Sequence, residues 1–326
     1  MLKLKYLFEN YDLAKTLLKN WAHDAHNLDA MLAQFRISSN AVYPFCTSGE
    51  VCFLRIAPVE EKLEKNLVGE MAFIEYLIAQ GFPALAPLRT NSGELYVKAT
   101  TEWGSYYATA FSKVKGIQLE DIEITNEIAV TYGKTLGQLH HLSAAYNPQV
   151  KKWTHEEVIA WIRTTLIAHG ANDGALAELA AVEAALSALP TNQDNYGLAH
   201  YDFELDNVFY HADSNACSVI DFDDGIYHWY ALDIEQVFDS LGDVLSGDAL
   251  DSTKKAFMHG YTSACHRVDD TESMRPLMRR FINLFAYARL IRSVAETFAD
   301  EPAWLLQLRT KLNEKISALE NSFLQP

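Results

Sequence analysis

The sequence LAHYDFELDNVFYHADSNACSVIDFDD, residues 198–224, carries the most informative pattern in this chain of 326 residues. His200, Asp202 and Asn207 form an H-x-D-x-x-x-x-N motif, and Asp221 follows the apolar run 218–220. Phosphoryl transfer needs a carboxylate that orients and deprotonates the attacking hydroxyl, together with Mg²⁺ held by oxygen ligands. The pattern therefore indicates an ATP-dependent kinase in which Asp202 is the base and Asn207 and Asp221 bind magnesium.

Two apolar segments, 207–210 and 217–220, flank the polar stretch 211–216. This arrangement predicts a hairpin that brings Asn207 and Asp221 side by side. Each piece alone has an ordinary explanation, since H-x-D arises by chance and Asn is common in turns. The conjunction of all the pieces at this spacing favours the catalytic interpretation.

The segments 200–207 and 219–223 resemble the Brenner motif of the aminoglycoside phosphotransferase and choline kinase-like families, which share the two-lobed protein-kinase fold. The resemblance implies that Asp202, with His200, belongs to the catalytic loop and that Asn207 and Asp221 hold magnesium. The residue between His and Asp is usually Gly in this group and is Tyr201 here.

The resemblance also implies two supporting acids. Asp233 would brace the catalytic loop through its backbone amides, and Asp223 would lie behind the metal ligands. For Asp233, a simple N-terminal acid that favours the helix dipole is the competing interpretation.

The resemblance implies an α+β fold with a small antiparallel-sheet N-lobe and a larger, mainly helical C-lobe. We expect the nucleotide-covering N-lobe at residues 1–111, a connector at 112–116, and the C-lobe with the catalytic loop and substrate pocket at 117–326. Apolar runs predict strands in the N-lobe at 41–45, 50–56, 94–98 and 106–111.

Nucleotide contacts are expected from the N-lobe. Arg55 stands where protein kinases carry a phosphate-binding Lys, and Arg can hold phosphate bidentately. Its expected partner is Glu70, which opens a helical pattern; a solvated surface acid is the alternative for Glu70. The covering loop contains Ser38, Ser39 and Asn40 in place of glycines, and these residues can turn tightly and donate hydrogen bonds.

Helical patterns dominate the second half of the chain. Apolar spacing predicts helices at 128–142, from 229 onward, and from about 271 to 324, and Thr154 and Glu157 have the form of a capping box. We interpret His140 and His141 as packing residues. Tyr287, Arg289 and Arg292 are candidates to face the substrate pocket.

Composition sets further bounds. The net charge of −16 argues against a nucleic-acid partner and permits a cationic, amine-bearing substrate, although acidity also serves solubility. The four cysteines form no C-x-x-C pair, and no apolar run is long enough to span a bilayer. We therefore expect a cytoplasmic protein with no membrane partner.

The expected function is Mg²⁺-dependent transfer of the ATP γ-phosphate to a hydroxyl of a small molecule, such as an amine-bearing metabolite or an aminoglycoside-like compound. Two alternatives stay open: a protein Ser/Thr kinase on the same scaffold, and a catalytically inactive nucleotide-binding module. The identity of the acceptor and the oligomeric state are left open.

Overall fold

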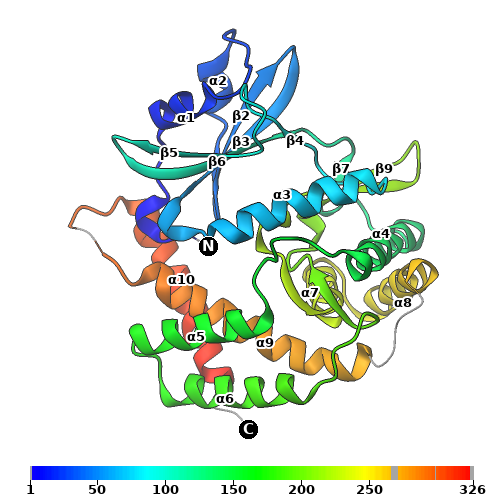
Figure 1. The fold of residues 1–326 in the computed structure, drawn as a ribbon. Coiled ribbons are helices and arrows are strands. Elements are labelled where there is room, and N and C mark those ends of the chain that lie inside the picture. The colour runs from blue at the N-terminus through cyan, green and yellow to red at the C-terminus, as the bar shows by residue number, and fades with distance from the viewer. Residues whose placement is uncertain (1, 266–270, 298, 324–326) are drawn as a thin grey trace.

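The computed structural model describes residues 2–265, 271–297 and 299–323. Its N-terminal part is built on a six-stranded antiparallel sheet in the order β1-β2-β3-β6-β4, with β5 also paired to β6 (Figure 1). The strands are β1 (Arg36–Ile37), β2 (Ala41–Thr47), β3 (Glu50–Pro58), β4 (Pro87–Leu88), β5 (Val97–Thr101) and β6 (Gly104–Ser112). The predicted strands at 41–45, 50–56 and 106–111 are confirmed, whereas the strand expected at 94–98 begins only at Val97.

The β2–β3 hairpin closes through Ser48 and Gly49, whose φ angles are 53° and 80°. Such left-handed angles suit glycine, which has no Cβ to clash. The turn fixes the register of β3, so that Arg55 pairs with Val42 on one side and with Thr109 on the other.

Three α-helices accompany this sheet: α1 (Tyr11–Leu18), α2 (Leu28–Leu32) and α3 (Glu64–Ala79), with short 3-10 turns η1 (Leu4–Tyr6) and η2 (Val59–Glu61). The expected start of α3 at Glu70 is wrong, because the helix begins six residues earlier, at Glu64. Leu67 extends the buried face of Met71 and Ile74 by one turn, since the three residues fall at i, i+4 and i+7. Glu70 therefore lies in the middle of the helix.

The C-terminal part is mainly helical. Its helices are α4 (Asn126–Ala145), α5 (His155–Ala168), α6 (Asp173–Ala188), α7 (Ala231–Val244), α8 (Gly247–Ala264), α9 (Thr271–Val294) and α10 (Ala303–Phe323). Helices α4 and α8 lie side by side at glycine contacts: a Cβ on Gly133 would be 1.9 Å from the Phe257 carbonyl oxygen, and a Cβ on Gly260 equally close to that of Val130. The predicted helix over 271–324 proves to be two helices, separated around Pro302; position 324 lies outside the described residues.

Short strands and turns carry the central motif. They are β7 (Ile117–Gln118), η3 (Leu119–Asp121), β8 (Tyr196–Ala199), η4 (Leu205–Asn207), β9 (Val208–His211), β10 (Ala216–Val219), η5 (Phe222–Asp224) and β11 (Ile226–Trp229). The predicted hairpin is confirmed, since β9 pairs with β10 and Val208 lies opposite Val219. The capping box is also confirmed: the Thr154 hydroxyl accepts from the Glu157 amide, and the Glu157 carboxylate accepts from the Thr154 amide.

The largest hydrophobic core joins the two parts of the chain. Phe73 and Ile74 of α3 contribute to the same buried cluster as Leu136 of α4 and Phe222 of η5. The sheet of the first part ends at Ser112, next to the expected connector 112–116. The exact lobe boundaries stay a prediction.

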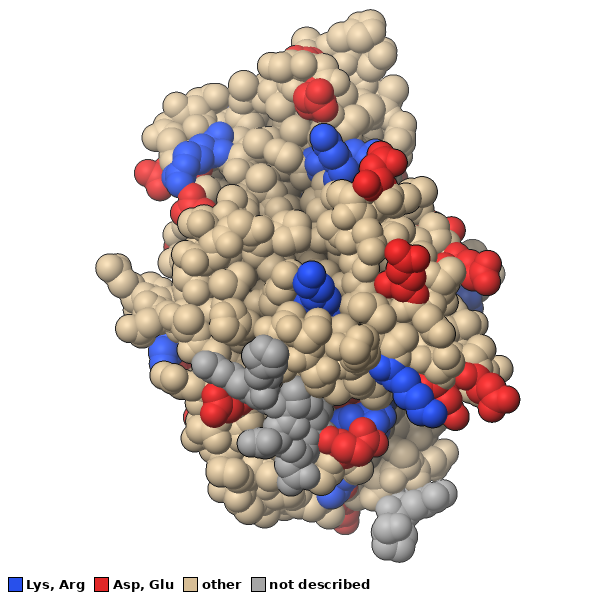
Figure 2. Space-filling model, turned by 90° about the vertical axis from the view of Figure 1, so that its right-hand side faces the viewer, with Lys and Arg blue, Asp and Glu red and all other residues tan. Residues whose placement is uncertain are grey.

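On the face shown in Figure 2, Lys and Arg side chains are scattered among Asp and Glu side chains. Among the residues described, no helix combines the length and the apolar character needed to cross a membrane.

Candidate active site

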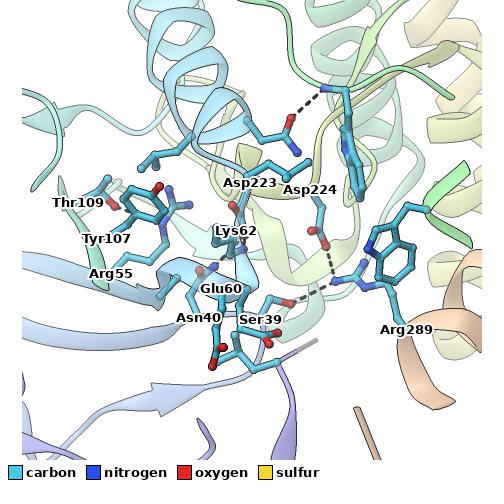
Figure 3. Close-up of a pocket in the computed structure, with 18 of the residues that line it drawn as sticks. Ser39, Asn40, Arg55, Glu60, Lys62, Tyr107, Thr109, Asp223, Asp224 and Arg289 are labelled. Atoms are coloured by element: carbon cyan, nitrogen blue, oxygen red, sulfur yellow. Dashed lines mark hydrogen bonds and ion pairs between the residues drawn. The ribbon is translucent and has the colours of Figure 1, made fainter. Parts of the chain in front are cut away.

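A cavity of about 190 Å³ opens between the sheet and the helical part (Figure 3). Its walls come from both parts of the chain, including the β1–β2 loop, β3, the segment before α3, η5 and α9. The charged residues that line it are Arg55, Glu60, Glu61, Lys62, Asp223, Asp224, Arg289 and Arg292. Asp223 and Asp224 of η5 line the cavity, whereas Asp202, Asn207 and Asp221 are not among its lining residues; Asp221 directly precedes η5.

The loop after β8 holds Asp202 against Asn207. The Asn207 side-chain amide donates to the Asp202 backbone carbonyl at 3.0 Å and to the Asp202 carboxylate at 2.9 Å. Because the amide nitrogen is used in this way, the Asn207 side-chain oxygen is the atom that can ligate a cation. Burial, and then the negative charges of Asp224 and Asp221, raise the pKa of Asp202 well above its ordinary value.

Asp221 lies next to this loop. The Ile220 amide donates to the Asn207 carbonyl at 3.0 Å, which ties the end of β10 to the start of β9. Asp221 itself has a φ of 61°, and its side chain remains 41% exposed. Its enclosure by protein atoms and the charge of Asp223 raise the pKa of Asp221 to about 6, whereas Arg55 opposes the shift.

Asp221 and Asn207 suit a hard divalent cation. A carboxylate and an amide oxygen, completed by phosphate oxygens and water, match the oxygen ligands that Mg²⁺ prefers. Burial and then the nearby carboxylates raise the pKa of Asp221, and a bound cation would offset the charge of those carboxylates. Within the described ranges there is no cluster of three or more His, Cys, Asp or Glu side chains that could hold a metal by itself, so the nucleotide would have to supply further ligands.

Asp233, at the start of α7, is fully buried and lies behind the catalytic loop. Its carboxylate accepts from the backbone amides of His200 and Tyr201, both at 2.8 Å, and bonds the His140 ring at 2.9 Å. These contacts are the ones that a residue bracing the catalytic loop would make. His140 is buried, as expected for a packing residue, and its other ring nitrogen bonds the Tyr261 hydroxyl, whereas His141 is exposed.

The prediction that grouped His200 with the catalytic residues needs correction. The His200 side chain is 1% exposed, and its Nε2 donates to the carbonyl of Ile220 at 3.0 Å. Burial lowers the pKa of His200 to about 4, so the ring is neutral near pH 7. His200 therefore supports the segment that precedes Asp221 and does not reach the cleft.

Tyr201 adopts a φ of 58°, which explains why glycine is usual at this position. Its carbonyl accepts from Gln236 at 3.1 Å, and its ring packs on Phe281 and Phe285 of α9 with centroid separations of 6.5 and 5.4 Å. Backbone hydrogen bonds and ring packing thus hold a strained conformation in place.

Arg55 and Glu70 form the expected pair. Two guanidinium nitrogens donate to the two Glu70 oxygens at 2.8 and 2.6 Å, and Arg55 Nε donates to the Thr109 hydroxyl at 3.2 Å. Glu70 is only 1% exposed, so the alternative of a solvated surface acid is wrong. Arg55 also lies 3.8 Å from the Asp221 carboxylate, which places a cation beside the candidate metal ligand.

We predict that Glu70→Gln lowers kcat/KM for ATP roughly tenfold, because a hydrogen bond to a charged group contributes ~1.5–3 kcal/mol. The amide keeps the shape of the side chain but leaves the buried Arg55 charge without its carboxylate. Steady-state kinetics at varied ATP would measure the effect. Glu75→Gln, on the exposed side of the same helix and paired with Arg89, is the matched control and should behave as wild type. Equal kinetics for the two variants would contradict the prediction.

The β1–β2 loop lies close to the helical part, with Ser39 and Asn40 near Asp223, Asp224 and Arg289 (Figure 3). The Asn40 amide donates to the Asp223 carboxylate at 3.0 Å, and Arg289 lies 3.5 Å from the Ser39 hydroxyl and 2.8 Å from Asp224. Ser39 and Asn40 line the cavity, whereas the Ser38 carbonyl accepts from the Leu2 amide.

Several residues of the site had no clear signal in the sequence. Lys62, from the segment before α3, donates a hydrogen bond to the Asp223 carboxylate. Burial alone would raise the pKa of Asp223, but the positive charges around it, with that of Lys62 first, lower this pKa below its ordinary value. Of the candidates on α9, Arg289 and Arg292 line the cavity, whereas Tyr287 is buried and donates to Glu320. Lys62 became recognisable only once the fold placed it opposite η5.

Glu204 lies beside the catalytic loop, where burial and the charges of Asp206, Asp239 and Asp243 raise its pKa to about 7. The folded state therefore holds this proton more tightly than the unfolded chain, whose value is near 4.5. Stability from this group is present below about pH 4.5 and is lost as the pH rises toward 7.

We predict that Glu204→Gln raises the free energy of unfolding by about 1–2 kcal/mol at pH 8 and has little effect at pH 4. The substitution removes a carboxylate that must ionise among other acids at high pH. Urea denaturation of both proteins at the two pH values would measure the difference. The same difference at pH 4 and pH 8 would count against it.

Comparison with known proteins identifies the family to which the chain belongs. The model of a family described as Phosphotransferase enzyme family matches residues 33–277. Amicoumacin kinase of Bacillus subtilis (strain 168) is 26% identical over 208 residues, which cover 60% of this chain and 59% of that protein. The matched region thus spans somewhat more than half of the length of this relative.

Solved structures share the fold over almost the whole chain. An amicoumacin kinase in complex with AMP-PNP, Ca²⁺ and Ami superposes with a TM-score of 0.76 at 18% identity, covering 98% of this chain and 95% of that chain. A microcompartment-associated aminopropanol kinase has a TM-score of 0.69 at 19% identity, covering 97% and 98%. A spectinomycin phosphotransferase in complex with ADP and its antibiotic has a TM-score of 0.59 at 14% identity, covering 98% and 95%. The predicted α+β, protein-kinase-like fold is confirmed.

Proposed function

The chain belongs to the phosphotransferase enzyme family, and from this premise we propose that it transfers the γ-phosphate of ATP to a hydroxyl group of a small molecule. One observation carries the proposal. Asp202 is held by Asn207, Asn207 is tied to the strand end that bears Asp221, and Asp221 lies beside the Arg55–Glu70 pair. These contacts connect the proposed base, the two proposed metal ligands and Arg55, which lines the cavity.

Asp202 would accept the proton of the attacking hydroxyl. The Asn207 amide fixes one carboxylate oxygen of Asp202 at 2.9 Å and leaves the other to orient the acceptor. Burial, and then the neighbouring carboxylates, hold the pKa of Asp202 above its ordinary range, which makes it a stronger base than an exposed aspartate.

Asn207 and Asp221 would hold Mg²⁺ together with the nucleotide. When bound, the ion neutralises charge on the phosphate oxygens. Arg55, oriented by Glu70, would grip the phosphates, and Ser38, Ser39 and Asn40 would cover them from the β1–β2 loop. Asp223 and Asp233 would keep the surrounding loops in place.

We propose an acceptor that bears an amine. Acidic side chains gather beside Asp202, since Glu204 interacts with Asp206, Asp239 and Asp243. Such a field attracts cations. Solved structures of this fold include an aminopropanol kinase and aminoglycoside phosphotransferases. The four cysteines are free thiols, which is compatible with action in the cytoplasm, where ATP is also available.

The test is ADP formation from ATP across a panel of amino-alcohols, amino sugars and aminoglycosides, with Mg²⁺ and with EDTA. We expect ADP to form only when Mg²⁺ and an amine-bearing alcohol are both present, and we expect mass spectrometry to find the acceptor heavier by one phosphoryl group. Absence of acceptor-dependent ADP formation across the panel would reject the proposed substrate class.

Controls without acceptor address the two alternatives. Transfer of label from ATP to the protein itself or to an added polypeptide would identify a protein kinase. Tight nucleotide binding that is indifferent to Mg²⁺, without turnover, would identify an inactive nucleotide-binding module.

A further inference from the structure

Lys152 lies between α4 and α5 and is only 2% exposed. Lysine is almost never buried to this extent unless its ammonium group finds partners. Here the ammonium group donates to the backbone carbonyls of Phe222 and Asp223, at 2.8 and 2.6 Å. A buried cation thus binds the turn that follows the candidate metal ligand Asp221.

The turn that Lys152 binds is η5, and the residue just before it is the left-handed Asp221, with a φ of 61°. A non-glycine residue keeps such a conformation only where its surroundings hold it. The next two carboxylates point to other partners, since Asp223 bonds Asn40 and Asp224 bonds Arg289. Lys152 binds the backbone of η5 through the Phe222 and Asp223 carbonyls.

The same lysine also contacts α3. A Cβ built on Gly69 would lie 2.7 Å from Lys152 Cγ and 3.1 Å from the Lys152 amide nitrogen, so the lysine stem crosses the helix where a side chain is missing. The next amide, of Trp153, donates to the Asn66 side chain of α3 at 2.9 Å. Glu70, the partner of Arg55, follows Gly69 directly.

We propose that Lys152 is a positioning residue that sets the place of the Asp221 carboxylate relative to the Arg55–Glu70 pair, and thereby the affinity of the nucleotide complex for its divalent cation. The proposal rests on the proposed function, because it assumes that Asp221 is a metal ligand. In this proposal Lys152 acts through η5, and it is not among the residues that line the cavity. A lysine that serves only the stability of the fold would leave metal affinity unchanged in a folded variant.

The experiment compares Lys152→Met with Lys151→Met. Lys151 is the adjacent, exposed lysine, whose ammonium group lies 5.5 Å from the Tyr227 ring centroid, and it serves as the matched control. Mn²⁺ binding in the presence of a non-hydrolysable ATP analogue is measured by electron paramagnetic resonance. Binding of the same analogue in EDTA is measured by calorimetry.

We expect the Kd for Mn²⁺ to rise about 10–100-fold in Lys152→Met, as for other groups that orient metal ligands, and to stay at the wild-type value in Lys151→Met. Analogue binding in EDTA should be unchanged in both. Wild-type Mn²⁺ affinity in Lys152→Met, or an equal loss of binding with and without metal, would overturn the proposal.

Gly69→Ala provides a second, independent route. The added methyl group must displace the Lys152 stem, so the Kd for Mn²⁺ should rise in this variant as well. In the double variant Gly69→Ala/Lys152→Met, the Kd for Mn²⁺ should be close to that of Lys152→Met alone, because both changes act on the same contact. If Lys152→Met does not fold, Gly69→Ala decides the question, and wild-type Mn²⁺ affinity in folded Gly69→Ala would overturn the proposal. A wild-type protein that binds no Mn²⁺ with the analogue would instead reject the proposed function itself.

Discussion

Asp202→Asn is expected to lower kcat by about 10²–10⁴-fold, the range that a positioned general base contributes. The amide keeps the size of the side chain but cannot accept the proton of the acceptor hydroxyl. Nucleotide binding should persist, because Arg55, Glu70 and Asp221 are untouched. Single-turnover transfer to the best acceptor of the panel would measure the loss, and calorimetry would measure analogue binding.

Asp206→Asn is the control for this prediction. It lies in the same loop and is exposed, so it removes a comparable charge without removing the proposed base. Its kcat should stay within a few-fold of wild type, although a weaker attraction for a cationic acceptor would raise KM. If Asp202→Asn retained wild-type kcat, the assignment of the base would fail.

Asp233→Ala is expected to destabilise the protein by about 3–5 kcal/mol, as when one partner of a buried charged network is removed. The change leaves the buried amides of His200 and Tyr201 and the ring of His140 without their shared acceptor. Because those amides belong to the catalytic loop, activity should fall along with stability. Urea denaturation followed by far-UV circular dichroism would measure the free energy of unfolding.

The matched control for Asp233 is Asp239→Ala on the same helix. The Asp239 side chain is 59% exposed and pairs with Arg279, so its loss should change stability by no more than about 0.5–1 kcal/mol. Similar unfolding free energies for the two variants would show that the buried network contributes little.

The local parts of the site could be predicted from the sequence. Asp202, Asn207 and Asp221 lie on one loop and one hairpin, so their spacing and the intervening apolar runs are enough to bring them together. The Arg55–Glu70 pair was expected from the resemblance to kinases, and the pairing of a strand with the helix that follows it agrees with that expectation. The error in the start of α3 did not affect the pair, since Glu70 stays on the buried face.

The contacts around η5 were not predictable in the same way. Lys62 and Lys152 reach this turn from 161 and 70 residues away, and each lies in an irregular segment. Nothing in the neighbouring residues distinguishes either lysine from a solvated one. Whether such a lysine is buried depends on which distant segments pack against it. The hydrophobic pattern of the sequence predicts helices and strands but not these long-range contacts.

Tyr201 has a consequence for how the enzyme can change during evolution. A left-handed tyrosine costs roughly 1–2 kcal/mol in backbone energy, and its ring is anchored on Phe281 and Phe285 of α9. Phe285 also lines the cavity. A substitution at Phe285 therefore changes both the wall of the cavity and the support of the residue before Asp202, so the two cannot be varied independently.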